Sequence, residues 1–316
     1  MRPTSIFSLI LLITMAGLSP GARAQTVLKV VHIDDPGVAA VFYAAKEGIV
    51  RSDKIKLEVS SVPLPALIQA MQTKQFDIIQ TSVIAYAKGV KRGLKARIIA
   101  VGAVPRNDGY GIFVRRDSPI KGVADLRGKN WGVLSLGASN VVHTRIVLNQ
   151  KYNINTAPLG GDLRPIEAPP LQLLTLLEKG NIDAMFAFGI GFYSAARHKD
   201  FRLLINSGAE YGQAFGPNPP MAALVAFTDR IEQNPEAMRE AQRLLYDSAK
   251  YYIDHREEVN RAVASKYRVS LDYLNWWASK GQIDPPFLRA PIFKGTGPIL
   301  TTDLQDRRVR LLPKTG

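Results

Sequence analysis

The chain has 316 residues, a formal net charge of +14 and no cysteine. Without cysteine, a thiol nucleophile, a thiolate metal site and an iron–sulfur centre are all excluded. A basic balance is one signature of nucleic-acid binding, but the basic residues are scattered, with clusters only at 88–95 and 306–310, so we expect no nucleic-acid partner. A positive field that favours small anions and a high isoelectric point without functional meaning both stay open.

The first 24 residues have the pattern of a secretory signal peptide. An apolar run at 6–18 and the small-residue exit Ala22-Arg23-Ala24 predict cleavage after Ala24, before Gln25. That run is shorter than the roughly 20 residues that span a bilayer, and no cysteine follows it to carry a lipid anchor. We therefore expect an exported, periplasmic protein whose mature part is long enough for two lobes.

Two stretches about a hundred residues apart follow the same order of elements. Pro63 and Pro169 each precede a helical pattern, and Asp77 and Asp183 each precede an apolar strand, with the same separation of 106 positions in both pairs. The predicted strands are 27–31, 55–59, 76–79, 131–134 and 182–185, and the predicted helices are 38–48, 64–73, 140–151 and 171–178. This alternation predicts an α/β fold of two facing lobes, each a mostly parallel sheet flanked by helices.

The chain is expected to cross between the lobes twice. A turn-rich segment at 105–109 indicates the first crossing, and the Gly- and Pro-rich segment 208–220 indicates the return. After the signal peptide at 1–24, lobe one then comprises 25–108 and 221–316, and lobe two comprises 109–220. The last part is predicted to be helical, starting at Asn234-Pro235, and a later helix after Ser270 carries Trp276-Trp277.

Loops that follow the strands are the candidate ligand site, because open parallel sheets bind ligands outside the carboxyl ends of their strands. The loop 137–140 joins a strand to a helix, whose free N–H groups favour a carboxylate, sulfonate or phosphate; alternatively, Ser139 only caps the helix. The carboxylates of loop 32–37 either meet a cationic group or cap the next helix, and capping is favoured for Asp35. The candidate residues are His32, Asp34, Pro36, Thr81, Ser82, Asp108, Tyr110, Gly137, Ala138, Ser139, Asn140, Phe186 and Phe188.

Sequence motifs of enzymes are missing. The four histidines are not spaced as metal ligands, and the chain lacks a nucleophile elbow, a phosphate loop and a dinucleotide-binding glycine motif. Asp77 and Asp183 stand at strand beginnings, away from the expected cleft, so we interpret them as structural. The rings of Phe186 and Phe188 either stack on a flat ligand or belong to the core. We expect no cofactor, no metal and no enzymatic activity.

Four segments carry a resemblance to a known family: 42–49, 74–78, 125–133 with 137–139, and 177–184. The most specific is Asp-Leu-Arg-Gly-Lys at 125–129, directly before a strand. On these residues the chain resembles the periplasmic substrate-binding proteins of ABC importers, in the nitrate/sulfonate/bicarbonate (taurine and NMT1/THI5-like) group, and the similarity is thinner after Pro285. This resemblance implies a two-lobed, type II Venus-flytrap fold that delivers a small solute to a permease in the inner membrane.

One departure from the family concerns the site. Members often carry Glu-Pro after the lobe-two strand that begins with Asp-Ala, whereas this chain has Phe188-Gly189-Ile190 there. Pyrimidine-synthesising enzymes of the same fold group carry a cysteine-rich iron site, which this sequence cannot form. We therefore expect a monomeric solute-binding protein for a small organic anion. A periplasmic sensor of the same fold is the alternative, and an enzyme on this fold is a third.

Overall fold

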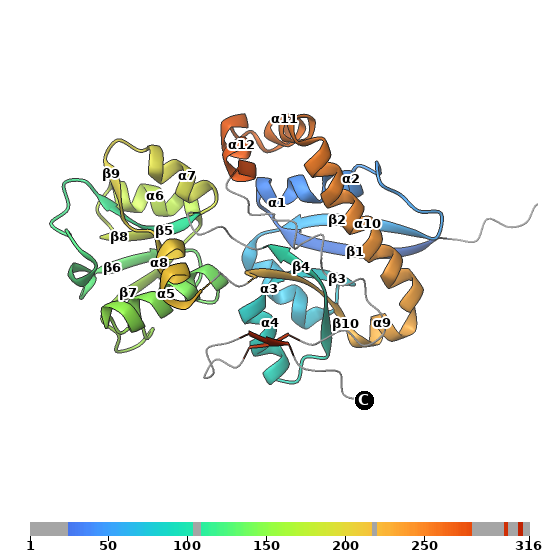
Figure 1. The fold of residues 1–316 in the computed structure, drawn as a ribbon, viewed down its shortest axis with the longest axis horizontal. Helices are drawn as coiled ribbons and strands as arrows, with labels where there is room; N and C mark the ends of the chain where they lie inside the picture. Colours follow the sequence, from blue (N-terminus) through green and yellow to red (C-terminus); the bar gives the residue numbers. More distant parts are fainter. Residues whose placement is uncertain (1–24, 104–108, 217–219, 280–299, 303–308, 312–316) are drawn as a thin grey trace, which may run out of the picture.

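The computed structural model describes residues 25–103, 109–216, 220–279, 300–302 and 309–311. They form two lobes that lie side by side, each built around one five-stranded sheet (Figure 1). The predicted signal peptide and Asp108 lie outside the described residues. The expected α/β fold of two lobes is confirmed.

The sheet of lobe one has the strand order β2-β1-β3-β10-β4. Its strands are β1 (Thr26–Ile33), β2 (Ile55–Val62), β3 (Ile78–Ser82), β4 (Ala96–Ala103) and β10 (Ala222–Phe227). β1 is parallel to β2 and β3, whereas β10 runs antiparallel to both β3 and β4. Because β10 follows lobe two in the sequence, lobe one is built from two separate stretches of chain.

Lobe two repeats this plan with the strand order β7-β6-β8-β5-β9. Its strands are β5 (Tyr110–Arg115), β6 (Asn130–Val133), β7 (Arg164–Glu167), β8 (Ala184–Phe188) and β9 (Phe201–Ile205). β6 is parallel to β7 and β8, and β5 is the antiparallel strand between β8 and β9. The duplicated order of elements therefore corresponds to two sheets of the same topology.

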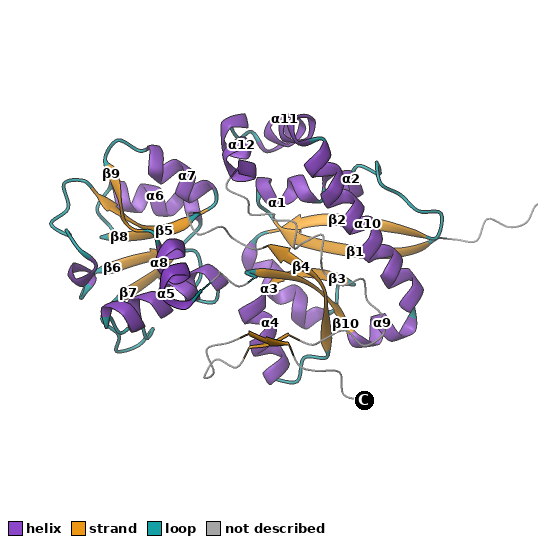
Figure 2. Cartoon of the chain, in the orientation of Figure 1, coloured by secondary structure: helices purple, strands orange, loops and turns teal. Residues whose placement is uncertain are grey.

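Helices cover both faces of each sheet (Figure 2). In lobe one they are α1 (Pro36–Val41), α2 (Tyr43–Lys46), α10 (Pro235–Asp254), α11 (Arg256–Tyr267) and α12 (Leu271–Ser279) against one face, and α3 (Leu64–Thr73) and α4 (Val83–Lys91) against the other, with α9 (Thr228–Gln233) after β10. In lobe two they are α5 (Ser139–Tyr152), α8 (Ser207–Phe215) and the 3-10 helix Val123–Leu126 on one face, and α6 (Pro170–Glu178) and α7 (Ile190–Arg197) on the other. The short strands β11 (Leu300–Thr302) and β12 (Val309–Leu311) pair with each other.

Asp77 and Asp183 have a structural role at strand beginnings, as predicted: Asp77 ties β1 to β3 in lobe one, and Asp183 ties β6 to β8 in lobe two. The N–H of Lys29 donates to the Asp77 carboxylate at 2.8 Å, and the N–H of Asp77 donates back to the Lys29 carbonyl at 2.9 Å. Asn130 and Asp183 make the same pair of bonds at 2.8 and 3.0 Å. Both carboxylates are thus used at the beginnings of strands, and the repeat extends to individual hydrogen bonds.

The predicted helix at 38–48 is wrong in its extent. The structure has α1, which ends at Val41, and the four-residue α2, separated by Phe42 with φ −89° and ψ 0°. The ring of Phe42 is buried and stacks on His32 with centroids 4.6 Å apart. Burial of this ring outweighs the local helical pattern, so the chain changes direction here.

The C-terminal helices follow their sequence signals. The Asn234 side chain accepts a hydrogen bond from the N–H of Ala237 at 3.0 Å, and Pro235 occupies the first turn of α10, as predicted. The Ser270 hydroxyl accepts from the N–H of Tyr273 at the start of α12, at 3.1 Å. The buried face of α10 includes the expected positions Ala237, Ala241, Leu244, Leu245, Ala249 and Tyr252.

Candidate ligand-binding site

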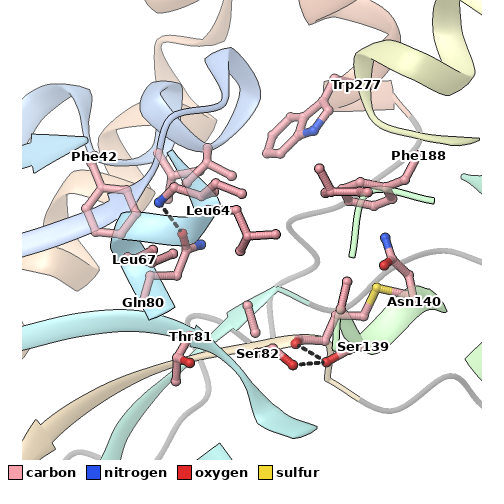
Figure 3. A pocket seen from close by; sticks show the side chains of 17 residues that line it. Phe42, Leu64, Leu67, Gln80, Thr81, Ser82, Ser139, Asn140, Phe188 and Trp277 are labelled. Atoms are coloured by element: carbon pink, nitrogen blue, oxygen red, sulfur yellow. Dashed lines mark hydrogen bonds between the residues drawn. The ribbon is translucent and has the colours of Figure 1, made fainter. Parts of the chain in front are cut away.

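A pocket lies between the two lobes, where the carboxyl ends of β1 and β3 face the loop between β6 and α5. It contains about 900 Å³ of empty space, including its open mouth. Figure 3 shows the side chains of the 17 residues that line it. They are Ile33, Val38, Val41, Phe42, Leu64, Leu67, Gln80, Thr81, Ser82, Leu134, Ala138, Ser139, Asn140, Phe188, Met221, Ala222 and Trp277. Because both lobes contribute, a solute bound here would contact both.

The walls of this pocket are mainly apolar. Helices α1 and α3 supply aliphatic side chains, and the rings of Phe42, Phe188 and Trp277 face the same space (Figure 3). None of the described lining residues carries a charged side chain. The pocket therefore suits a molecule with an apolar body, whose polar groups meet neutral hydrogen-bonding partners.

Two carboxamides supply donors on opposite sides of the pocket. The N–H of Ile33 donates to Oε1 of Gln80 at 3.0 Å, and the N–H of Val141 donates to Oδ1 of Asn140 at 2.9 Å. Because the NH₂ end of a carboxamide only donates, the end that accepts from a backbone N–H is the oxygen. The NH₂ groups of Gln80 and Asn140 are left as donors for an acceptor group of a solute.

Two serine hydroxyls connect the lobes at the edge of the pocket opposite Trp277 (Figure 3). The Ser139 hydroxyl donates to the carbonyl oxygen of Met221 at 2.8 Å, so the Ser82 hydroxyl donates to Oγ of Ser139, at 2.7 Å. The Met221 carbonyl also accepts from the N–H of Val83 at 3.2 Å. This contact, which we call the serine bridge, joins β3 and α4 of lobe one to α5 of lobe two and to the returning chain.

Ser139 is not the cap of its helix. Ala138 occupies the N-cap position of α5 and makes no side-chain cap bond. Ser82 does act as a cap, because its Oγ accepts from the N–H of Ala85 at 3.3 Å. A solute that took a hydrogen bond from Ser139 would compete with the serine bridge.

Of the thirteen residues singled out by sequence, six line the pocket: Thr81, Ser82, Ala138, Ser139, Asn140 and Phe188. His32 lies behind Phe42, is fully buried and bonds through Nδ1 to the Ile33 carbonyl. Burial lowers the pKa of His32 to about 4, so the ring is neutral at pH 7.

Further candidates lie near the pocket without lining it. Asp34 is exposed and accepts a hydrogen bond from the Ser61 hydroxyl at 3.0 Å. Pro36 begins α1, whose N-cap is Asp35, as sequence favoured. Gly137 stands in the turn before α5 and donates through its N–H to Oγ of Ser135 at 3.3 Å.

Tyr110 and Phe186 belong to the core of lobe two. Both are buried, and their ring centroids are 6.2 Å apart. Burial raises the pKa of the Tyr110 hydroxyl, which keeps it neutral at physiological pH. Phe186 is thus a core residue, while Phe188, two positions later on the same strand, lines the pocket.

Trp277 is a pocket residue that sequence reasoning did not select. It comes from α12, about 240 positions after α1, and its indole packs directly over Gly37: a Cβ atom there would lie 2.3 Å from the ring. A glycine in the first turn of α1 is the only local signal of this close approach. The aliphatic residues from α1 and α3 were also missed, because their helical spacing is that of ordinary core positions.

The described residues contain no group of three or more His, Asp or Glu side chains that could hold a metal ion. No helix within the described ranges is long and apolar enough to cross a membrane.

A family comparison matches residues 53–186 to a model described as ABC transporter, phosphonate, periplasmic substrate-binding protein. The matched range runs from β2 to β8 and therefore includes parts of both lobes. A search of curated proteins gives no match.

Solved structures of similar fold include three transport proteins. The periplasmic aliphatic sulphonate-binding protein SsuA of Escherichia coli has a TM-score of 0.65 and 17% identity, over 81% of this chain and 84% of that protein. The alkanesulfonate-binding protein SsuA of Xanthomonas axonopodis, solved with MOPS, has a TM-score of 0.64 and 17% identity, over 82% and 84%. The periplasmic nitrate-binding protein NrtA of Synechocystis has a TM-score of 0.57 and 15% identity, over 79% and 69%.

At these identities the solved structures establish the fold, and the family match adds the sequence pattern of residues 53–186. The resemblance drawn from the sequence is confirmed, although the matching family model is the phosphonate one, and nitrate- and sulfonate-binding proteins appear among the structural neighbours. The chain has the two-lobed fold of the periplasmic binding proteins, and its residues 53–186 match the model of a phosphonate ABC-transporter substrate-binding protein.

Proposed function

We propose that this protein is the solute-binding component of an ABC importer, which captures a small organic solute between its lobes and delivers it to a permease in the inner membrane. The observation that carries the proposal is the pocket itself, because its lining comes from both lobes. A solute in that position stabilises the arrangement in which the lobes face each other, and hinged closure of this kind is a common way to signal occupancy.

The protein acts in the periplasm after cleavage behind Ala24, as a monomer without a nucleic-acid partner. Lobe one comprises residues 25–108 and 221–316, and lobe two comprises 109–220. The first crossing then lies between β4 and β5, and the return crossing lies between α8 and β10. The matched family and the similar structures are transport proteins, which supports binding without catalysis.

The solute is an organic anion with an apolar body. Its body fits the aliphatic and aromatic walls, and its anionic oxygens fit the NH₂ groups of Gln80 and Asn140, beside the start of α5. Because the described lining has no cationic side chain, the charge is met by neutral donors and by the helix dipole. Hydrogen bonds to a charged acceptor are stronger than neutral ones, which makes such a site workable. The sulphonate- and nitrate-binding proteins of the same fold support an anionic ligand.

A thermal-shift screen with alkane sulfonates, alkyl phosphonates, carboxylates and nitrate tests this proposal. The variant Ala138→Phe fills the pocket, and Ala66→Phe adds the same ring on the exposed face of α3 as a matched control. A solute at a hundredfold excess over Kd adds about 2.7 kcal/mol of stability. We expect stabilisation of the parent and of Ala66→Phe but not of Ala138→Phe. Equal stabilisation of all three would place the solute outside this pocket, and no response to any compound class would contradict the anionic ligand.

A further inference from the structure

The consecutive tryptophans of α12 contact two different parts of the molecule. Trp277 is buried and lines the pocket. Trp276 packs instead against the core of lobe two: its ring lies 5.9 Å from that of Phe192 and 5.5 Å from that of Tyr193, measured between centroids. One helix of lobe one therefore contacts both the pocket and the opposite lobe.

The contact is reciprocal. From α7 of lobe two, Ile190 and Tyr193 pack against the core of lobe one, and the Tyr193 ring meets Tyr273 of α12 edge-on at 5.4 Å. The guanidinium of Arg197 lies 3.7 Å from the centre of the Tyr193 ring. We call the rings of Phe192, Tyr193, Tyr273 and Trp276 the aromatic latch. Each lobe inserts at least one of these rings into the other lobe's core.

The turn before α7, at Gly189, lies close to residues of lobe one. Gly189 has φ +54° and ψ −130°, a conformation that residues with a side chain rarely adopt. A Cβ atom on Gly189 would lie 3.6 Å from the Asp35 carboxylate and 3.7 Å from the Tyr273 hydroxyl, so this turn touches lobe one. The Tyr273 hydroxyl is buried beside Asp35 and the N–H of Ile190 without a hydrogen bond of standard geometry within the described residues.

The pocket lies between two interlobe contacts, with the serine bridge at one edge and Phe188 and Trp277 at the other (Figure 3). In each lobe, a pocket residue is linked through the chain to the latch. Trp277 follows Trp276 on α12, and Phe188 precedes the turn into α7, which carries Phe192 and Tyr193. We propose that the aromatic latch holds the lobes together without a solute, so that α12 must release α7 before a solute can enter or leave. The gating role rests on the proposed function, whereas the latch itself is measurable without any solute.

Pulsed electron–electron resonance between two spin labels tests the latch. The chain has no cysteine, so two introduced cysteines are labelled specifically. Ser265→Cys on α11 and Gln172→Cys on α6 are exposed and belong to different lobes. The protein is refolded from urea to remove bound solute. We expect one dominant distance in the labelled parent and an added population at longer distance after Trp276→Ala.

Further variants separate the latch from general destabilisation. Tyr193→Ala removes the same contact from lobe two and should give the same longer distances, while Trp276→Phe keeps a ring and should retain most of the short-distance population. Tyr246→Ala removes an exposed aromatic ring from α10, remote from lobe two, and should change nothing. Unchanged distances in both Trp276→Ala and Tyr193→Ala would overturn the latch. That outcome would leave the solute screen, and with it the proposed function, unaffected.

Discussion

Two buried histidines should make the protein lose stability in weak acid. His143 is 3% exposed, stacks on Tyr211 at 4.8 Å between centroids, and its Nδ1 makes no hydrogen bond within the described residues. Burial lowers the pKa of His143 to about 4, and burial likewise lowers that of His32 to about 4. In the unfolded chain both rings take up a proton near pH 6.5, so unfolding becomes more favourable as the pH falls through that value.

The size of the effect follows from the two pKa values. A ring that titrates at 6.5 when unfolded and at about 4 when folded contributes stability that is fully present above pH 6.5. Between pH 7 and pH 5 the loss is about 2 kcal/mol for each histidine, and it continues until the pH reaches the folded value. Asp35 acts in the opposite direction, because burial raises the pKa of its carboxyl group. As the pH falls, the folded state takes up this proton before the unfolded state does, which stabilises the fold. A comparison of variants at the same pH removes this opposing contribution.

Urea unfolding at pH 7 and pH 5 measures the effect directly. His143→Phe keeps the stacked ring and removes the titrating group, so its stability should fall by about 2 kcal/mol less than that of the parent between these pH values. His255→Phe is the matched control, because His255 also stacks on a tyrosine but is exposed. An identical pH dependence in His143→Phe and the parent would refute the argument that burial keeps this ring neutral.

Three further variants test single contacts. Gly37→Val should lower the free energy of unfolding by about 1–3 kcal/mol through overpacking, because a Cβ would lie 2.3 Å from the indole of Trp277; urea titration checks this, and unchanged stability would contradict the packing. Ser139→Ala removes the hydrogen bond to the Met221 carbonyl and should cost about 1 kcal/mol; the same titration would show no change if the serine bridge did not form. Gly189→Ala should cost about 1–2 kcal/mol, because its φ of +54° is unfavourable for alanine, and thermal melting without loss would count against this backbone conformation.

The repeated order of strands and helices was enough to predict two α/β lobes. Residue pairs recur because the same local structure occurs in each lobe. Pro63 and Pro169 each precede a helix, and Asp77 and Asp183 each accept a hydrogen bond from the backbone of the neighbouring strand. Helix starts such as Asn234-Pro235 could also be predicted from sequence, since capping depends on neighbouring residues. The break in the helix at Phe42 could not be predicted, because it accompanies the burial of that ring against His32.

The site was predictable only where it follows strand ends. Thr81, Ser82 and the loop before α5 were found by that rule, and the structure brings them together across the lobes. The rule could not separate Phe186 from Phe188, because both side chains lie on the same face of β8. They differ only in that Phe188, at the end of the strand, reaches the pocket. The same rule could not predict Trp277 as a pocket residue, because its contact with α1 depends on how the last helices pack.

Native mass spectrometry of the protein, purified without denaturation from its own host, tests solute binding between the lobes most directly. Our account predicts that the parent carries a small organic molecule, that gentle activation releases it for identification as an anion, and that Ala66→Phe carries it too. The pocket-filled variant Ala138→Phe should appear at its bare mass. If Ala138→Phe retained the same molecule at the same occupancy, the solute would not be bound between the lobes, and the central claim would be contradicted.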